Sequence, residues 1–188
     1  MHHPTLADHS SAELAELTRA AWRFAAHAHR EQQVPGTQLP YLLHLAQVAS
    51  ELAPALRDLT QDQAVLATCV AILHDCMEDC GITEQELTAA FGPQICAGVQ
   101  ALTKNAALSK EQRMADCLAR ICMQPQVIWR VKLADRITNL GKPPEDWSHD
   151  KRIAYRAEAQ LILDRLESSS AWLASRMRQC IADYERYC

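Results

Sequence analysis

The segment ILHDCMED, residues 72–79, places one imidazole and three carboxylates in an otherwise apolar run. His74 lies four residues before Glu78, which puts both on one row of a helix, and Asp75 and Asp79 form a second such pair. Carboxylates at the carboxyl end of a helix oppose the helix dipole, so a cation would stabilise them. Taken alone, the segment is more typical of a solvated acidic helix end. With partners elsewhere in the chain, it predicts a divalent metal ion and an activated water.

Two other apolar segments carry polar side chains on their inward faces. VKLADRITNL, residues 131–140, contains Asp135, and burying an unpaired carboxylate in such a stretch would be costly. Asn139 follows one turn later on the same face. YLLHLAQVA, residues 41–49, sets His44 among leucine and valine, where a lone histidine is usually a core residue with its hydrogen bonds satisfied. Because three separate segments each offer an inward polar group, we expect them to share one site.

Helices must position these side chains, because no part of the sequence alternates with period two as a strand would. Capping-box patterns, in which Ser or Thr is followed three residues later by Glu or Gln, mark helix starts at Ser10, Thr60, Thr83 and Ser109. We expect helices near 10–30, 41–53, 60–79, 83–91, 93–104, 109–123, 125–140, 148–167 and 169–186. Loops rich in Gly and Pro are expected at 32–40 and 141–147. The sequence therefore predicts an all-α fold, a compact bundle of about eight to ten helices.

Length and charge limit the classes of protein to consider. A chain of 188 residues can bury the core of one domain, and we expect residues 1–188 to form a single domain. The net charge of −4 gives no general attraction to nucleic acid or to an anionic membrane. Because no long apolar run and no secretory signal are present, no membrane span is expected, and the cytoplasm is the expected location. Oligomeric state is not indicated by the sequence.

The eight cysteines form no CxxC pair and no regular framework. Cys76 and Cys80 could be imagined as metal thiolates or as a redox pair. Small buried side chains in a reducing compartment are the better interpretation for a chain of this length.

The motifs taken together resemble a known family. HDCMED fits an HDxxED motif, PYLLHL a PYxxHP motif and VKLADRITNL a KLADRxxN motif, and these are similar to the HD-superfamily hydrolase domain of the RelA/SpoT alarmone enzymes. The compact length resembles the stand-alone small alarmone hydrolases, the Mesh1-like group. The similarity covers about residues 20–166, and we expect helices in 148–186 to pack on this core. ITEQELTAAFGPQICAGVQALTK and PPEDWSHDKRIAYRAEAQLIL resemble further segments of the family.

The resemblance implies a role for each candidate residue. The metal ligands of the family fall on His44, His74, Asp75 and Asp135. Such a mixed nitrogen and oxygen site suits Mn²⁺ and would also accept Fe²⁺ or Zn²⁺. The catalytic carboxylates, which orient or deprotonate the attacking water, fall on Glu78 and Asp79. Substrate-binding residues fall on Asn139, Lys110, Lys151 and Tyr155. For the last three of these, a solvated helix face is an equally good interpretation.

The reaction that the resemblance implies is hydrolysis of the 3′-pyrophosphate of an alarmone nucleotide, (p)ppGpp or (p)ppApp, with release of diphosphate. The partner is then a small-molecule nucleotide. One alternative is an HD phosphohydrolase acting on another nucleotide, such as NADPH or a nucleoside monophosphate. Another is a catalytically silent nucleotide-binding module, although two water-activating carboxylates would serve no purpose in a site kept for binding alone.

The chain departs from the family pattern in the loop REQQVPGTQLPY. Gln33 and Val34 stand near the place of a basic pair, from which an arginine of the family holds the guanine base. Neither residue can stack on a purine and donate in a planar fork as arginine does. Arg30, at the end of the preceding helix, is a candidate substitute. The preference between guanine and adenine is therefore open.

Overall fold

The computed structural model describes residues 5–188. Their helices are α1 (Ser11–Ala28), α2 (Leu42–Leu52), α3 (Gln61–Leu73), α4 (Cys76–Cys80), α5 (Glu84–Leu102), α6 (Lys110–Cys122), α7 (Gln126–Asn139), α8 (His149–Leu166) and α9 (Ala171–Tyr184). Short 3-10 turns are η1 (Leu6–Asp8), η2 (Ala53–Leu56), η3 (Glu167–Ser169) and η4 (Glu185–Tyr187). Within residues 5–188, one isolated bridge between Gln33 and Pro40 is the only β-structure. The all-α prediction is confirmed.

The predicted helix starts follow from their caps. The Ser10 hydroxyl accepts a hydrogen bond from the Glu13 N–H, and the Glu13 carboxylate accepts one from the Ser10 N–H. Thr83 and Glu86 form the same reciprocal pair at the start of α5. Each pair satisfies two N–H groups of a first turn that have no partner in the helix. The predicted box at Ser109 does not form, because its hydroxyl makes no capping bond, although α6 still begins at the next residue.

The prediction of a single helix at 60–79 is wrong in one respect, because the segment forms two helices. α3 ends at Leu73 and α4 begins at Cys76. Asp75 has φ −97° and ψ −3°, the sparsely populated bridge between the helical and extended regions, where many active-site residues are found. Gly81 then ends α4 with φ +68°, a left-handed conformation that suits glycine. The break places His74 and Asp75 in the turn between two helices.

The two helices expected at 83–91 and 93–104 run on as one element, α5, with a kink between them. Gly92 lies at the kink with φ +79° and ψ 167°, a conformation open only to glycine. Pro93 follows it at the start of the second part, where its missing N–H costs nothing. The predicted boundary is therefore correct, although helical turns continue on both sides.

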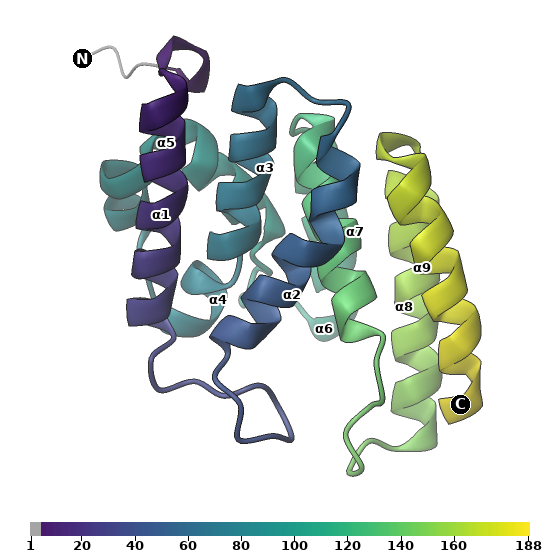
Figure 1. Ribbon diagram of the computed structural model, residues 1–188. Helices are drawn as coiled ribbons and strands as arrows, with labels where there is room; N and C mark the ends of the chain where they lie inside the picture. Colours follow the sequence, from purple (N-terminus) through teal and green to yellow (C-terminus); the bar gives the residue numbers. More distant parts are fainter. Residues whose placement is uncertain (1–4) are drawn as a thin grey trace.

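α7 is the central helix of the bundle. It packs against α2, α3, α8 and α9, and residues 130–137 are all buried. α1 covers the far side of α3, while α8 and α9 lie side by side at the opposite edge of the molecule (Figure 1). Gly98 lets α5 pack closely against α3 and α7, because a Cβ at this position would lie 2.8 Å from the Val70 side chain and 3.0 Å from the Ile128 side chain.

The loops after α1 and after α7 lie at the same end of the molecule (Figure 1). Backbone bonds close the first loop, with the Tyr41 N–H donating to Gln32 O and the Val34 N–H donating to Leu39 O, both at 2.9 Å.

Across residues 5–188, no helix has the length and apolar character needed to cross a membrane.

Candidate metal centre and active site

Four side chains from three parts of the chain meet inside the bundle. His44 comes from α2, His74 and Asp75 from the break after α3, and Asp135 from α7. Asp75 Oδ2 lies 2.9 Å from His74 Nε2 and 3.7 Å from His44 Nε2. Asp135 Oδ1 lies 3.7 Å from each of these two nitrogens. The structure therefore brings together all four predicted ligands.

Each of the two imidazoles presents a buried Nε2 atom to the two carboxylates. His74 Nδ1 donates to the Ala71 carbonyl at 2.8 Å, which leaves its Nε2 unprotonated in the neutral ring. In this neutral form the buried Nε2 atoms of His44 and His74 receive no hydrogen bond from any residue in 5–188, and they face only the carboxylates of Asp75 and Asp135. Buried polar atoms are nearly always paired, so two orphans facing two carboxylates call for a ligand. A divalent cation fits this donor set of two nitrogens and two carboxylates, and the bond to Ala71 is the support that a metal-binding histidine commonly has.

Hydrogen bonds from neighbouring side chains hold both carboxylates. The Tyr41 hydroxyl donates to Asp75 Oδ2 at 2.5 Å. Lys132 Nζ donates to Asp135 Oδ2 at 2.9 Å, and Asn139 Nδ2 donates to Asp135 Oδ1 at 2.6 Å. These partners fix the direction in which each carboxylate points before any ligand arrives.

Burial and the facing charges set the protonation of the centre. Burial lowers the pKa of His44 below its ordinary value, and the Asp135 carboxylate offsets this only in part. For His74, burial also disfavours the charged form, but Asp75 and Asp135 outweigh it and raise the pKa well above its usual value. Burial raises the pKa of Asp135, but Lys132 and His74 outweigh it and hold the pKa well below its usual range. The centre therefore keeps negative charge facing the two imidazoles, which a divalent cation would balance.

Glu78 and Asp79, the two predicted catalytic carboxylates, project from α4 beside this centre. The Lys104 backbone N–H donates to Glu78 Oε2 at 2.9 Å, and the Lys104 ammonium donates to Glu78 Oε1 at 3.0 Å. Gln32 Nε2 donates to Asp79 Oδ2 at 2.8 Å. Burial raises the pKa of Asp79, so its carboxylate is a stronger base than one in water.

A cavity of about 230 Å³ connects the candidate metal centre to these carboxylates. His74, Asp75 and Asp135 line it together with Glu78 and Asp79. Two of the predicted substrate residues, Asn139 and Tyr155, line it as well. The cavity therefore joins a candidate metal centre, two candidate bases and polar side chains within reach of one small substrate.

Comparison with known proteins agrees with this geometry. The family model described as "HD domain" matches residues 21–167. The chain belongs to the HD domain family. A relative from Drosophila melanogaster, named guanosine-3′,5′-bis(diphosphate) 3′-pyrophosphohydrolase MESH1, is 27% identical over 177 residues, which cover 92% of this chain and 94% of the relative. The protein of the same name from Mus musculus is 30% identical, with 89% of this chain and 93% of the relative covered. The predicted resemblance to small alarmone hydrolases is confirmed.

A solved structure confirms the fold of this HD domain. It is described as "A metazoan ortholog of SpoT hydrolyzes ppGpp and plays a role in starvation responses", and it superposes with a TM-score of 0.77. The two chains are 24% identical, and the alignment covers 93% of this chain and 97% of the other. The helical arrangement around the candidate centre is thus that of a known HD-domain structure.

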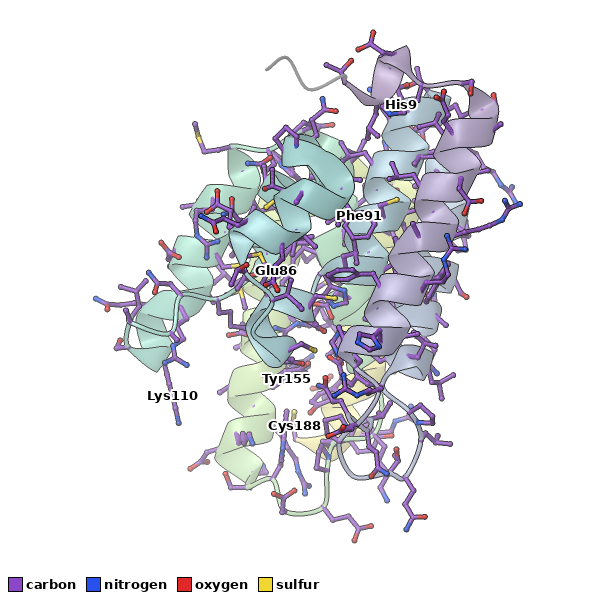
Figure 2. The ribbon with its side chains drawn as sticks, turned by 90° about the vertical axis from the view of Figure 1, so that its left-hand side faces the viewer. His9, Glu86, Phe91, Lys110, Tyr155 and Cys188 are labelled. Atoms are coloured by element: carbon purple, nitrogen blue, oxygen red, sulfur yellow. The ribbon has the colours of Figure 1, made fainter. Side chains whose placement is uncertain are left out.

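Two predicted substrate residues of this HD domain lie outside the cavity. Lys110 is exposed at the start of α6, and Figure 2 shows it at the periphery, whereas Tyr155 is half-buried and lines the cavity. Lys151 is exposed on α8, where its ammonium lies 4.0 Å from the centre of the Trp147 ring. The structure does not bring these lysines together with the candidate active site.

The cations that do line the cavity are not indicated by the sequence motifs. Among residues 5–188 these are Lys104, Lys132 and Arg136, and each is paired with a carboxylate. The spacing of Lys132, three residues before Asp135 on one helix, could have indicated a pair. The contact between Lys104 and Glu78 joins the segment after α5 to α4, and no periodic pattern in the sequence indicates it.

The three ion pairs differ in how easily they open. The side chains of Lys132 and Arg136 are 6% and 5% exposed, whereas that of Lys104 is 37% exposed. Removing one partner from a buried pair costs about 3–5 kcal/mol. A solvent-exposed pair contributes only about 0–1 kcal/mol. Lys104 can therefore leave its partner far more readily than the other two.

The two cysteines of α4 do not line the cavity of the candidate active site. Cys76 Sγ lies 3.6 Å from His29 Nε2, and Cys80 Sγ lies 3.2 Å from His29 Nδ1. Burial raises the pKa of the Cys76 thiol to about 12, and it raises that of Cys80 as well. Both shifts oppose thiolate formation, so the interpretation as a metal or redox pair is disfavoured.

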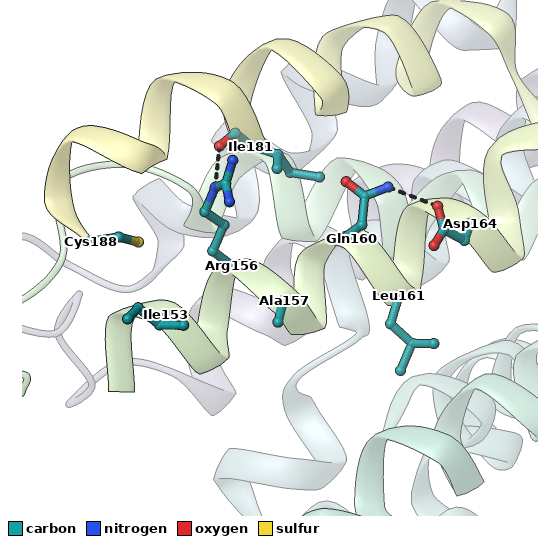
Figure 3. A pocket seen from close by; sticks show the side chains of 8 residues that line it. All are labelled: Ile153, Arg156, Ala157, Gln160, Leu161, Asp164, Ile181 and Cys188. Atoms are coloured by element: carbon teal, nitrogen blue, oxygen red, sulfur yellow. Dashed lines mark hydrogen bonds between the residues drawn. The ribbon is translucent and has the colours of Figure 1, made fainter. Parts of the chain in front are cut away.

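A separate hollow of about 440 Å³ lies between α8 and α9 (Figure 3). Arg156 Nε donates to the Ile181 carbonyl, and the Gln160 amide donates to the Asp164 carboxylate. The polar groups that line this hollow thus bond to other parts of the same two helices, and they do not converge on a ligand.

Proposed function

We propose that this chain is a metal-dependent hydrolase that removes the 3′-diphosphate from an alarmone nucleotide, (p)ppGpp or (p)ppApp. The MESH1 relatives from Drosophila melanogaster and Mus musculus carry the name of this reaction for the guanosine compound. The observation that carries the proposal is the convergence of two buried imidazole nitrogens on two carboxylates beside Glu78 and Asp79. The described residues, 5–188, would act as one hydrolase domain.

His44, His74, Asp75 and Asp135 would hold one divalent ion, and we propose Mn²⁺. Two nitrogens and two carboxylates suit this ion and would also accept Fe²⁺ or Zn²⁺. When bound, the ion would supply Lewis acidity and lower the pKa of a coordinated water. Lys132, Asn139 and Tyr41 would keep the ligand carboxylates in position through the bonds described above.

The proposed reaction adds one water molecule across the bond between the 3′ oxygen of the ribose and its phosphorus. The hydroxyl group ends on the phosphorus, which leaves as diphosphate, and the proton ends on the 3′ oxygen. Glu78 and Asp79 would orient the water and accept its proton. Gln32 and Lys104 hold these two carboxylates toward the cavity, which reduces the entropy lost when the water is positioned.

Asn139 and Tyr155 are the substrate contacts that we retain. Both line the cavity, and the bond from Asn139 to Asp135 places its amide next to the metal centre. Lys110 and Lys151 lie outside the cavity, so we assign neither a contact with the phosphates. Gln33 and Val34 take part in the backbone pairing that closes their loop.

Neither Gln33 nor Val34 can hold guanine as the arginine of the family does. For this reason the proposed substrates include both guanine and adenine alarmones.

A substrate panel tests the proposal. The full chain, loaded with Mn²⁺, is given ppGpp, ppApp, NADPH and nucleoside monophosphates at equal concentrations, and the phosphorus products are identified by ³¹P NMR. We expect diphosphate from at least one alarmone. In Glu78→Gln the rate should fall by about 100-fold or more while the melting temperature is retained, because a positioned base typically contributes that much. Release of phosphate from NADPH alone would favour the other phosphohydrolase, and no turnover at all would favour a silent binding module.

A further inference from the structure

The proposed substrate carries a diphosphate, and a cation in the cavity must meet it. Lys132 is buried and paired with Asp135, and Arg136 is buried and paired with Glu158. Their charges are therefore already neutralised within the folded protein. Lys104 differs, because its side chain is 37% exposed and its partner Glu78 is 28% exposed. Among the cations that line the cavity in residues 5–188, Lys104 is thus the one able to exchange partners without unfolding the site.

Lys104 contacts Glu78 through two independent groups. Its backbone N–H bonds to Glu78 Oε2, and its side-chain ammonium bonds to Glu78 Oε1. If the ammonium leaves, the backbone bond still fixes the carboxylate and Oε1 loses its donor. The ammonium itself sits on a flexible four-carbon chain and can turn toward another anion nearby.

We propose that Lys104 binds the 3′-diphosphate of the substrate, and that it releases Glu78 Oε1 when it does so. This assignment rests on the proposed function and deepens it. The exchange replaces one ion pair with another, so no charge is left unpaired at Lys104. At the same time, Glu78 gains a free oxygen beside the cavity when substrate is present. The water-orienting carboxylate thus becomes available as the substrate binds.

The position of Lys104 supports this assignment. It lies just beyond α5, after Thr103, which is extended with φ −70° and ψ 126°. Lys104 lines the cavity that contains Asp75 and Asp135, and it also lines a neighbouring hollow of about 670 Å³ between α5 and α6. Lys104 is therefore the residue that these two hollows share.

Inhibition by inorganic diphosphate tests the assignment. The full chain is assayed on its best alarmone at a fixed free Mn²⁺ concentration, and the inhibition constant of diphosphate is measured for wild type and variants. Lys104→Met should raise this constant and the KM by about tenfold or more, because a charge-assisted hydrogen bond to the anion is lost. Lys104→Arg should restore both to within about threefold, since its cation can still pair with phosphate.

The matched control is Lys142→Met. Lys142 is also an exposed lysine in an ion pair, with Glu145 at 3.2 Å, but it does not line the cavity. Its substitution should leave the inhibition constant within about twofold of wild type, as expected for a surface pair. If Lys104→Met lowers kcat but leaves the inhibition constant unchanged, Lys104 only positions Glu78 and the assignment is wrong.

A second measurement uses the wild-type chain alone, so it does not depend on how a variant folds. Lysine amines are acetylated with and without inorganic diphosphate in the presence of Mn²⁺, and the modified sites are counted by mass spectrometry. Diphosphate should protect Lys104 by about fivefold or more, because a lysine bound to the anion is withdrawn from the reagent. The reactivity of Lys142 should not change. A chain that hydrolyses the alarmone with Lys104 unprotected overturns this assignment alone, whereas a chain that shows neither turnover nor protection overturns the proposed function as well.

Discussion

Asp135 has two roles that a substitution can separate. Its carboxylate faces both histidines of the candidate centre, and it also neutralises the buried ammonium of Lys132. Only the first role concerns a metal ion, while the second concerns the fold. The two roles lead to different expectations for metal uptake and for the free energy of unfolding.

Asp135→Asn should abolish stoichiometric Mn²⁺ uptake, measured by elemental analysis after dialysis. Without metal it should also lower the free energy of unfolding in urea by about 3 kcal/mol, because Lys132 is left as a buried, unpaired charge. Adding Lys132→Met should recover at least half of the lost stability and none of the metal uptake. If the double variant is no more stable than the single one, the pair does not carry the stability assigned to it.

Tyr155 gives the chain a measurable dependence on alkaline pH. Burial raises the pKa of its hydroxyl to about 12 in the folded protein, while an unfolded tyrosine has a pKa of about 10. The neutral form is favoured by folding, so its contribution is complete below pH 10 and is lost as the pH rises toward 12. Wild type should therefore lose about 2–3 kcal/mol more than Tyr155→Phe over this range, measured by urea unfolding at each pH. Parallel pH curves for the two proteins would contradict this expectation.

At the scale of single residues, the sequence predicted the groups that lie in motifs and missed those that meet across space. His44, His74, Asp75 and Asp135 converge in the structure as expected, although their role as metal ligands stays a prediction. Lys104 could not be selected, because its contact with Glu78 depends on where α5 ends relative to α4. Lys110 matched a motif but lies at the periphery, and only the three-dimensional arrangement separates it from Lys104.

At the scale of elements, helix starts were easier to predict than the break at His74. Capping boxes can be found in the sequence because each depends on side chains three residues apart, and three of the four that it predicts form. The break was missed because residues 69–73 are buried on all sides, so the apolar run has no helical period to interrupt. The kink at 92 was found because glycine and proline stand next to each other there.

Gly92→Ala should lower the free energy of unfolding by about 1–3 kcal/mol, because alanine cannot adopt φ +79° and ψ 167° without strain. A Cβ at this position would meet nothing within 4 Å, so the expected loss is due to the backbone alone. Gly141→Ala is the matched control, since its Cβ also has open space and its φ is not positive. Urea unfolding should show a change of less than about 0.5 kcal/mol for the control, as is usual for surface substitutions.

At the scale of the whole molecule, the candidate centre connects elements that are distant in the chain. Its side chains come from α2, from the turn between α3 and α4, and from α7 in the middle of the bundle. An ion bound there would link these elements in the folded state and would have no such site in the unfolded chain. Metal binding and global stability must therefore be coupled.

Mn²⁺ at about 100 times its dissociation constant should stabilise the fold by about 2.7 kcal/mol. For a chain of this size, that corresponds to a rise in melting temperature of about 5–10 °C. Differential scanning calorimetry with added Mn²⁺, and again after a chelator, measures the shift. Asp135→Asn should show no shift in either condition, and an equal shift in that variant would place the ion elsewhere.

The backbone bond from residue 104 to Glu78 has an evolutionary consequence. Every amino acid except proline has the N–H that this bond requires, so drift at this codon would preserve the orientation of the carboxylate. The side chain, in contrast, would be free to diversify and to adapt the pocket to a new anionic metabolite. Selection could in this way retarget the enzyme through one position without rebuilding its catalytic apparatus.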